Sequence, residues 1–285
     1  MATPTYSDIK RYSAMARDVS KRARTEFVRR ASEIDYTDWS RASDELRELC
    51  RAIVRTYGMG ASTLGAQWYD YCRRLAIGEG DPAEPLTPNE SALTYDMEQA
   101  IHGLYAGDTT PEQMADAMGA TVEKHVHELS RNTVSAALQR DYEAQVVRGG
   151  SSRAKSRYRW TRVTVGTSCA FCTMLASRGA VYLSRESAGG SPSSKFHDDC
   201  DCVVLPFADS GDIRGYEDTL DACSKAYYDA RTAIARDELP DELNQRIAEA
   251  KERHNARFKA GEVSEPWRDF NEITMVMRWQ NPGMH

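Results

Sequence analysis

Four of the seven cysteines of this chain fall in one short window, which constrains the fold more than any other feature. CAFC at residues 169–172 is followed by HDDCDC at residues 197–202. Together they offer five soft or borderline metal ligands within 34 residues: Cys169, Cys172, His197, Cys200 and Cys202. Structural zinc takes about four nitrogen or sulfur ligands, usually from two short segments that supply two each. The window therefore predicts a structural Zn²⁺ site with a small module built around it.

Five candidates compete for four ligand positions, and the spacing leaves two choices open. If the chain enters a strand at Cys200, then Cys200 and Cys202 point to the same face and both bind, which leaves His197 beside the site. Alternatively, His197 binds together with one of them. Because the window is short and rich in glycine, we expect the module to unfold when the metal is lost.

Two rival hypotheses use the same residues. CAFC followed by helix-like sequence is also typical of a thiol redox pair, Cys169 and Cys172, but the βαβ context of such folds is missing upstream. His197 and the acids of HDDCDC could instead hold Mg²⁺ in a DNA-processing nuclease. We expect the acids to be solvated turn residues, and the surplus of thiolates favours a closed structural site. No GxxxxGK[ST], GxGxxG or GxSxG motif occurs, which removes the commonest nucleotide-binding and acyl-hydrolase classes.

The first part of the chain follows a helical period. Apolar residues recur every three or four positions over residues 5–31, which predicts an amphipathic helix with a basic outer face. A second helix is expected to begin after the cap Asp38 and to stop at Gly58, before a third helix that contains Cys72. GEGDPAEPLTPNE, residues 78–90, is a turn-rich linker by composition.

Helical periods resume after the linker and again near the C terminus. Helices are expected at 90–104, from 110–111, at 120–147, and in three segments after about residue 216. His125 and His127 are two positions apart and face different directions on such a helix, so we treat both as surface histidines. The period changes after residue 148, where alternation predicts a strand over 157–165, with further short strands at 180–183 and 202–207.

The overall composition is that of a globular protein. The chain has 285 residues, of which 41% are apolar and 28% charged, enough to bury a core. It has no run of roughly 18 apolar residues and no signal-peptide core at its start, so we expect a soluble protein without a membrane partner. The expected fold is mainly α-helical with a small zinc-stabilised α+β module in the middle-to-C-terminal part. Its expected regions are 1–150 (helical), 151–210 (the Cys/His module) and 211–285 (helical).

A basic stretch precedes the cysteines, although the net charge of −6 argues against a protein that coats nucleic acid. Its arginines alternate with aromatic residues, a composition that suits phosphate contacts and base stacking. The nucleic-acid-binding candidates are Arg153, Lys155, Arg157, Tyr158, Arg159 and Trp160. The alternative, which we favour, is a strand with its aromatic residues inward and its arginines in water.

The order of these features resembles the MuF-like minor head proteins of tailed bacteriophages, also called head morphogenesis proteins. An arginine-rich strand, CxxC with a helix, a glycine-rich loop, H-x2-C-x-C and a strand ending in proline follow one another over about residues 157–207. The Cys/His cluster is the signature of that family. The resemblance thus gives the five candidate ligands the role of a metal site. The chain departs from the pattern at Asp201, where such motifs commonly carry a basic residue.

The resemblance also implies a function. Members are expected in few copies inside the head near the portal, after assembly in the host cytoplasm, with roles in head assembly and DNA packaging or ejection. The implied partners are the portal protein and the major capsid or scaffold protein, with viral DNA as a further one. We therefore expect a non-enzymatic minor capsid protein with a structural zinc knuckle. The alternatives are the nuclease that uses His197 and adjacent acids, and the redox protein.

Overall fold

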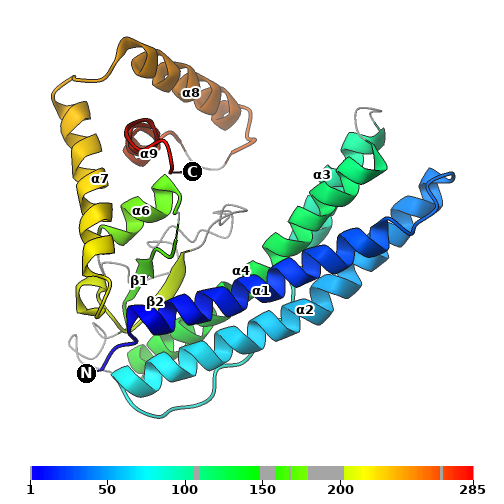
Figure 1. The fold of residues 1–285 in the computed structure, drawn as a ribbon, viewed down its shortest axis with the longest axis horizontal. Coiled ribbons are helices and arrows are strands. Elements are labelled where there is room, and N and C mark those ends of the chain that lie inside the picture. The colour runs from blue at the N-terminus through cyan, green and yellow to red at the C-terminus, as the bar shows by residue number, and fades with distance from the viewer. Residues whose placement is uncertain are drawn as a thin grey trace.

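The computed structural model describes residues 2–105, 110–147, 158–166, 168–178, 202–263 and 266–284. Within these ranges the chain is mainly helical and contains one small antiparallel sheet. Three long helices, α1, α2 and α4, run side by side with α3 beside α4 at the far end of this bundle (Figure 1). The sheet and the helices α6 to α9 gather at the other end. None of the described helices has the length and apolar content needed to cross a membrane.

Helix α1 spans Tyr6–Ala31, as the apolar period predicts. It begins with a capping box in which the Thr5 side chain accepts from the backbone of Asp8, and the Asp8 side chain accepts from the backbone of Thr5. These contacts pair backbone donors that the first turn of a helix leaves without partners. The buried stripe of α1 includes Ile9, Ala23 and Phe27, so one face of the helix packs along the whole bundle.

Helix α2 spans Trp39–Ala76 and is capped by Asp38, whose side chain accepts from two backbone amides. The expected stop at Gly58 is wrong, because the helix continues through this residue. A Cβ on Gly58 would lie 2.5 Å from Leu129 Cδ1, and one on Gly65 would lie 2.3 Å from the Ser130 carbonyl oxygen. These glycines therefore allow α2 to approach α4 closely.

Helix α3 spans Glu90–Tyr105 and follows the linker, as predicted. Helix α4 spans Pro111–Val147 as one continuous helix, so the expectation of two separate segments there is wrong. Gly119 lies within α4, and a Cβ at this position would lie 2.8 Å from Val28 Cγ2 of α1. Gly119 therefore allows α4 to pack closely against α1, and it does not end the helix.

The sheet pairs β1, Trp160–Val163, with β2, Val203–Pro206. The strands are antiparallel, with Trp160 opposite Pro206 and Val163 opposite Val203. All eight residues of the two strands are buried, because α6 packs against β1 while α2 and α4 pack against β2. The strand expected at 180–183 lies outside the described residues.

The remaining elements surround the sheet and its helix α6, Ala170–Ala176. A short 3-10 helix, η1, spans Ser210–Asp212 and precedes α7, Glu217–Ala235. Helix α8, Asp241–Lys259, is mostly exposed and buries Leu243 and Ile247. Helix α9, Asp269–Gln280, packs on α6 and α7.

Two large apolar cores result from this arrangement. The distal core fills the far end of the bundle with residues of α1 to α4, among them Phe27, Leu46, Met97, Met118 and Val126. The proximal core joins the near ends of α1, α2 and α4 to the sheet and to α6, α7, α8 and α9. Its members include Ile9, Tyr69, Leu138, Trp160, Leu205, Tyr216 and Val276. The proximal core therefore draws residues from all three regions expected from the sequence.

Candidate metal centre

The CxxC pair lies on the first turn of α6. Cys169 is the N-cap residue, and its Sγ accepts from the backbone N–H of Cys172 at 3.4 Å. The side chains of Cys169 and Cys172 are only 4% and 1% exposed. The spacing of three residues thus brings both sulfur atoms to the start of one buried helix, where the helix dipole favours negative charge.

Cys202 belongs to HDDCDC, the second of the two cysteine-containing segments, which we call knuckles. It lies beside the first turn of α6. It directly precedes β2 and is 1% exposed. Because β2 pairs with β1, and α6 packs on β1, Cys202 joins Cys169 and Cys172 in a small buried cluster of its own, with Phe171 packed against it. We call these three cysteines the thiol cluster. The structure thus brings together three of the five ligand candidates, while His197 and Cys200 lie outside the described residues.

Arg162 of β1 reaches into the thiol cluster. Its Nη1 lies 3.7 Å from Cys172 Sγ and 3.3 Å from Cys202 Sγ, and its guanidinium carbon lies 5.9 Å from the centre of the Phe171 ring. The residue is 5% exposed. The expectation that arginines of this strand lie in water holds for the exposed Arg159 and is wrong for Arg162. Only the strand register, which puts Arg162 opposite Val204 beside Cys202, could have indicated this contact.

The donor atoms of the thiol cluster are of the kind that zinc prefers. Buried cysteines of both knuckles belong to one small cluster, and zinc binds thiolates strongly. Among the residues that the structure describes, no three His, Cys, Asp or Glu side chains are grouped so as to hold a metal ion. A complete centre would thus also need His197 or Cys200, as the two knuckles predict.

The nucleic-acid-binding candidates are distributed differently. Arg153, Lys155 and Arg157 lie outside the described residues. Trp160 is 4% exposed and belongs to the proximal core. Tyr158 is half-buried, with its ring 5.7 Å from that of Phe207, whereas Arg159 is exposed. Tyr158 and Arg159 are therefore the described members of this set whose side chains reach solvent.

The two histidines of α4 are not surface residues, and that expectation is wrong. His125 is 6% exposed, and its Nε2 lies 3.1 Å from Asp96 Oδ2, which also accepts from Lys124 at 2.8 Å. His127 is half-buried, and desolvation lowers its pKa well below the ordinary 6.5, helped by the positive charge of Arg131. The apolar period could have located His125, because it lies three residues after Val122 and beside Val126 in the buried stripe.

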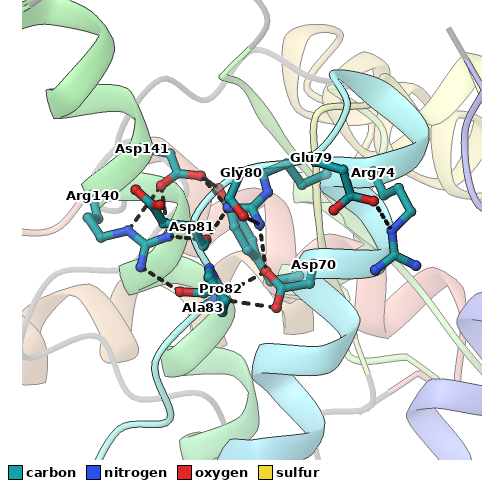
Figure 2. A network of polar contacts seen from close by, with 11 residues as sticks. Asp70, Arg74, Glu79, Gly80, Asp81, Pro82, Ala83, Arg140 and Asp141 are labelled. Atoms are coloured by element: carbon teal, nitrogen blue, oxygen red, sulfur yellow. Dashed lines mark hydrogen bonds and ion pairs between the residues drawn. The ribbon is translucent and has the colours of Figure 1, made fainter.

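A charged network fixes the linker to α2 and α4. Arg73, 4% exposed, donates to the carboxylate of Asp141 at 3.2 Å and to the Gly80 carbonyl at 2.9 Å. Figure 2 shows Arg140 reaching Asp141 and the linker carbonyls of Asp81 and Pro82. These charges are paired with one another and with backbone groups, which is an arrangement that stabilises the structure.

The same network touches the sheet. Tyr69 donates to Asp141 at 2.7 Å, and its ring packs 5.4 Å from that of Phe207, directly after β2. Burial, together with the hydrogen bond to the carboxylate of Asp141, raises the pKa of Tyr69, which keeps its hydroxyl protonated as a donor. The linker, the bundle and the sheet are therefore joined through Tyr69.

The fold and the site together define a helical protein in which a long bundle carries a small module with a buried thiol cluster. The profile of one family, described as "VG15 protein", matches residues 3–230, from before α1 into α7. Since this is most of the sequence, the chain belongs to the VG15 family.

Two relatives come from mycobacteriophages. The "Gene 15 protein" of Mycobacterium phage D29 is 30% identical over 215 residues, which cover 64% of this chain and 71% of the relative. The "Gene 15 protein" of Mycobacterium phage L5 is 28% identical over 220 residues, 62% of this chain and 69% of the relative. These matches confirm the expectation of a bacteriophage protein. No solved structure matches the chain.

Proposed function

We propose that this phage protein is a minor capsid, or head morphogenesis, protein of MuF-like type. It would lie inside the head near the portal, contact the portal and the major capsid or scaffold protein, and act in head assembly and DNA packaging or ejection. Zn²⁺ would be a structural component, held by four of the residues Cys169, Cys172, His197, Cys200 and Cys202. Membership of a phage protein family supports this proposal.

The observation that carries the proposal is the burial of the thiol cluster. Its three cysteines are at most 4% exposed, and the half-buried Phe171 packs against them. A redox or nucleophilic cysteine must be reached by its substrate, and a catalytic metal keeps an open ligand position. A thiol cluster that is buried in this way is typical of a structural metal site, which stabilises the fold.

The shape of the described chain supports an assembly role as well. A long bundle of α1, α2 and α4 extends away from β1, β2 and α6, which together we call the thiol module (Figure 1). Salt bridges on its surface, such as Arg47 with Glu98 at 2.8 Å, link neighbouring helices. We propose that region 1–150 contacts other head proteins, region 151–210 is the metal-dependent module, and region 211–285 packs around that module.

A gene deletion in the encoding phage tests this function. Deletion is expected to give heads that are misassembled or lack DNA, and a plasmid copy of the gene should restore infectious particles. Mass spectrometry should find the protein in purified heads. Normal yields of filled, infectious particles without the gene would contradict the proposal.

A nuclease assay separates the proposal from its main alternative. The purified full chain is incubated with linear DNA and Mg²⁺ or Mn²⁺, and we expect no cleavage. Cleavage that His197→Ala abolishes, without any change in melting temperature, would replace the assembly role by that of a metal-dependent nuclease.

A further inference from the structure

A surface hollow lies between α1 and α2 near the start of α1. Its volume is about 260 Å³, and the described residues that line it come from these two helices, which lie side by side along the bundle (Figure 1). On each helix the lining residues are spaced by three or four positions, so one face of α1 and one face of α2 enclose the space. We call it the α1–α2 hollow.

Aromatic and apolar side chains form much of the α1–α2 hollow. The rings of Tyr12 and Trp68 stack with their centroids 4.6 Å apart and their planes 7° apart, and both residues are buried. Met15 and Tyr71 also line the hollow and remain 45% and 37% exposed. Apolar side chains that gather at a hollow and stay exposed are typical of a surface that another molecule covers.

The outer face of α1 carries its charges in an order that complements its own reverse. One stripe along this helix, with steps of three and four residues, consists of Asp8, Arg11, Met15, Asp18 and Arg22. All of them are exposed except Asp8, which is half-buried. In an antiparallel pair of α1 helices with Met15 at the two-fold axis, Arg11 of each copy faces Asp18 of the other. Asp8 in turn faces Arg22, so each acid meets a base, as a self-complementary interface requires.

The charged side chains of this stripe are available for such a pairing. Within one chain, Arg22 Nη2 lies 2.8 Å from Asp18 Oδ2, and both side chains are more than half exposed. Because an exposed pair of this kind contributes little to stability, both ions can also bind a partner across an interface. The hydrogen bond from the Thr5 side chain lowers the pKa of Asp8, so its carboxylate is charged at neutral pH.

From the hollow and this order of charges we infer that a second copy of the chain docks here, so that α1 forms the interface of a two-fold homodimer. Met15 of each copy enters the α1–α2 hollow of the other, and the acids and bases of the two stripes pair around it. A water molecule takes about 30 Å³ in the liquid, so a hollow of about 260 Å³ has room for a methionine side chain. The dimer is independent of the proposed metal centre and of the proposed role in the head.

Sedimentation equilibrium of the full chain tests the dimer. At micromolar concentration we expect a mass of twice the 32.0 kDa of one chain. Met15→Glu should raise the dissociation constant of the dimer by about 100-fold or more, because it places two carboxylates near the two-fold axis in an apolar hollow. The control is Phe258→Glu, which changes a 40% exposed residue of α8, away from α1 in Figure 1, and should leave the dissociation constant unchanged.

An exchange of charges tests the antiparallel arrangement. Arg11→Asp alone and Asp18→Arg alone each place like charges opposite one another, and each should raise the dissociation constant by about tenfold. The double variant restores opposite charges, so its dissociation constant should return to within about threefold of the wild-type value. An effect of either substitution on the single chain would not be rescued in this way. Circular dichroism first establishes which variants are folded.

Two results would overturn the proposed dimer. A wild-type chain that sediments as a monomer at about 100 μM would refute it and leave the α1–α2 hollow to a different protein. A wild-type dimer that neither Met15→Glu nor the single charge variants weaken would show that the two copies meet at another surface. If Met15→Glu does not fold, the comparison of the single and double charge variants with the wild type decides.

Discussion

The two ends of this molecule are stabilised in different ways. The distal core is built from four helices of 16 residues or more, which contribute fully buried side chains such as Phe27, Leu46 and Met97. In the thiol module, β1 and β2 have four residues each and α6 has seven. Each large apolar side chain that is fully buried contributes roughly 1.5–3 kcal/mol, so the distal end is held by apolar burial.

The thiol module cannot rely on its own elements in this way. A two-stranded sheet is at best marginally stable by itself, and a helix of seven residues is too short to persist alone. Polar groups also lie in its interior, since Arg162, Thr161 and Thr164 are 5% exposed or less. The module therefore depends on the covering helices of the proximal core, and the proposed metal centre would add bonds at its thiol cluster.

The largest expected effect comes from removing the thiols of one knuckle. Cys169→Ser together with Cys172→Ser should abolish zinc binding, which contributes on the order of 10 kcal/mol to structural zinc modules. We expect the module to unfold while most helical signal, which comes from the bundle, persists. Thermal melting is followed by circular dichroism, which reports mainly on the helical bundle, and by tryptophan fluorescence, which includes Trp160 of the module. Cys50→Ala in the distal core is the control, and an equal loss of zinc there would contradict the assignment.

The network at the linker joins the bundle to the sheet at the proximal end, and breaking it is expected to destabilise this end. Asp141→Asn removes the charge that faces Arg73, whose side chain is 5% exposed. Arg73 keeps Asp70, 3.1 Å from its Nη2, but loses one of its two carboxylates, which should cost about 2 kcal/mol in the free energy of unfolding. Urea denaturation measures this loss. The control is Glu79→Gln, because its ion pair with Arg74 is exposed (Figure 2) and should contribute less than about 1 kcal/mol. Equal effects of the two variants would refute this interpretation.

Two glycines of α2 provide a smaller, matched test of the bundle. Gly65→Ala places a methyl group against the Ser130 carbonyl, where the expected distance is 2.3 Å, and should destabilise the chain by about 2 kcal/mol. Gly60→Ala meets nothing within 4 Å, so it should stabilise the helix by about 0.5–1 kcal/mol. Melting temperatures of the pair should thus move in opposite directions. A shift in the same direction would contradict the close packing of α2 on α4.

The smallest expected effect is the pH dependence from His127. Because its pKa in the folded chain lies well below 6.5, the unfolded chain binds more protons, and stability is complete above pH 6.5 and falls as the pH drops below it. The groups that act on the ring are Arg131, Arg17 and, with opposite sign, Cys202. His127→Gln should flatten the decline between pH 6.5 and more acidic values, as measured by urea denaturation at each pH. If the free energy of unfolding falls with the same slope in the variant, His127 is not the source of the pH dependence.

The sequence predicts the parts of this structure that depend on local patterns. Apolar periodicity located α1 and α3, and the cysteine spacing predicted that Cys169, Cys172 and Cys202 meet. The sequence pattern predicts a helix end at Gly58, whereas the actual role of this glycine, contact with Leu129, depends on a partner 71 residues away. The sequence does not predict the burial of Arg162 for the same reason, since an arginine in a basic stretch gives no local sign of the sulfur atoms that it contacts.

Hydrogen–deuterium exchange of the full chain, with and without a zinc chelator, tests the difference between the two ends most directly. If a thiol-bound metal holds the module, chelation should speed exchange in peptides covering β1, α6 and β2. Peptides from α1 to α4 around Phe27, Leu46 and Met97 should exchange as before. Unchanged exchange at the strands, or an equal acceleration in the distal bundle, would contradict the claim that the metal stabilises the module alone.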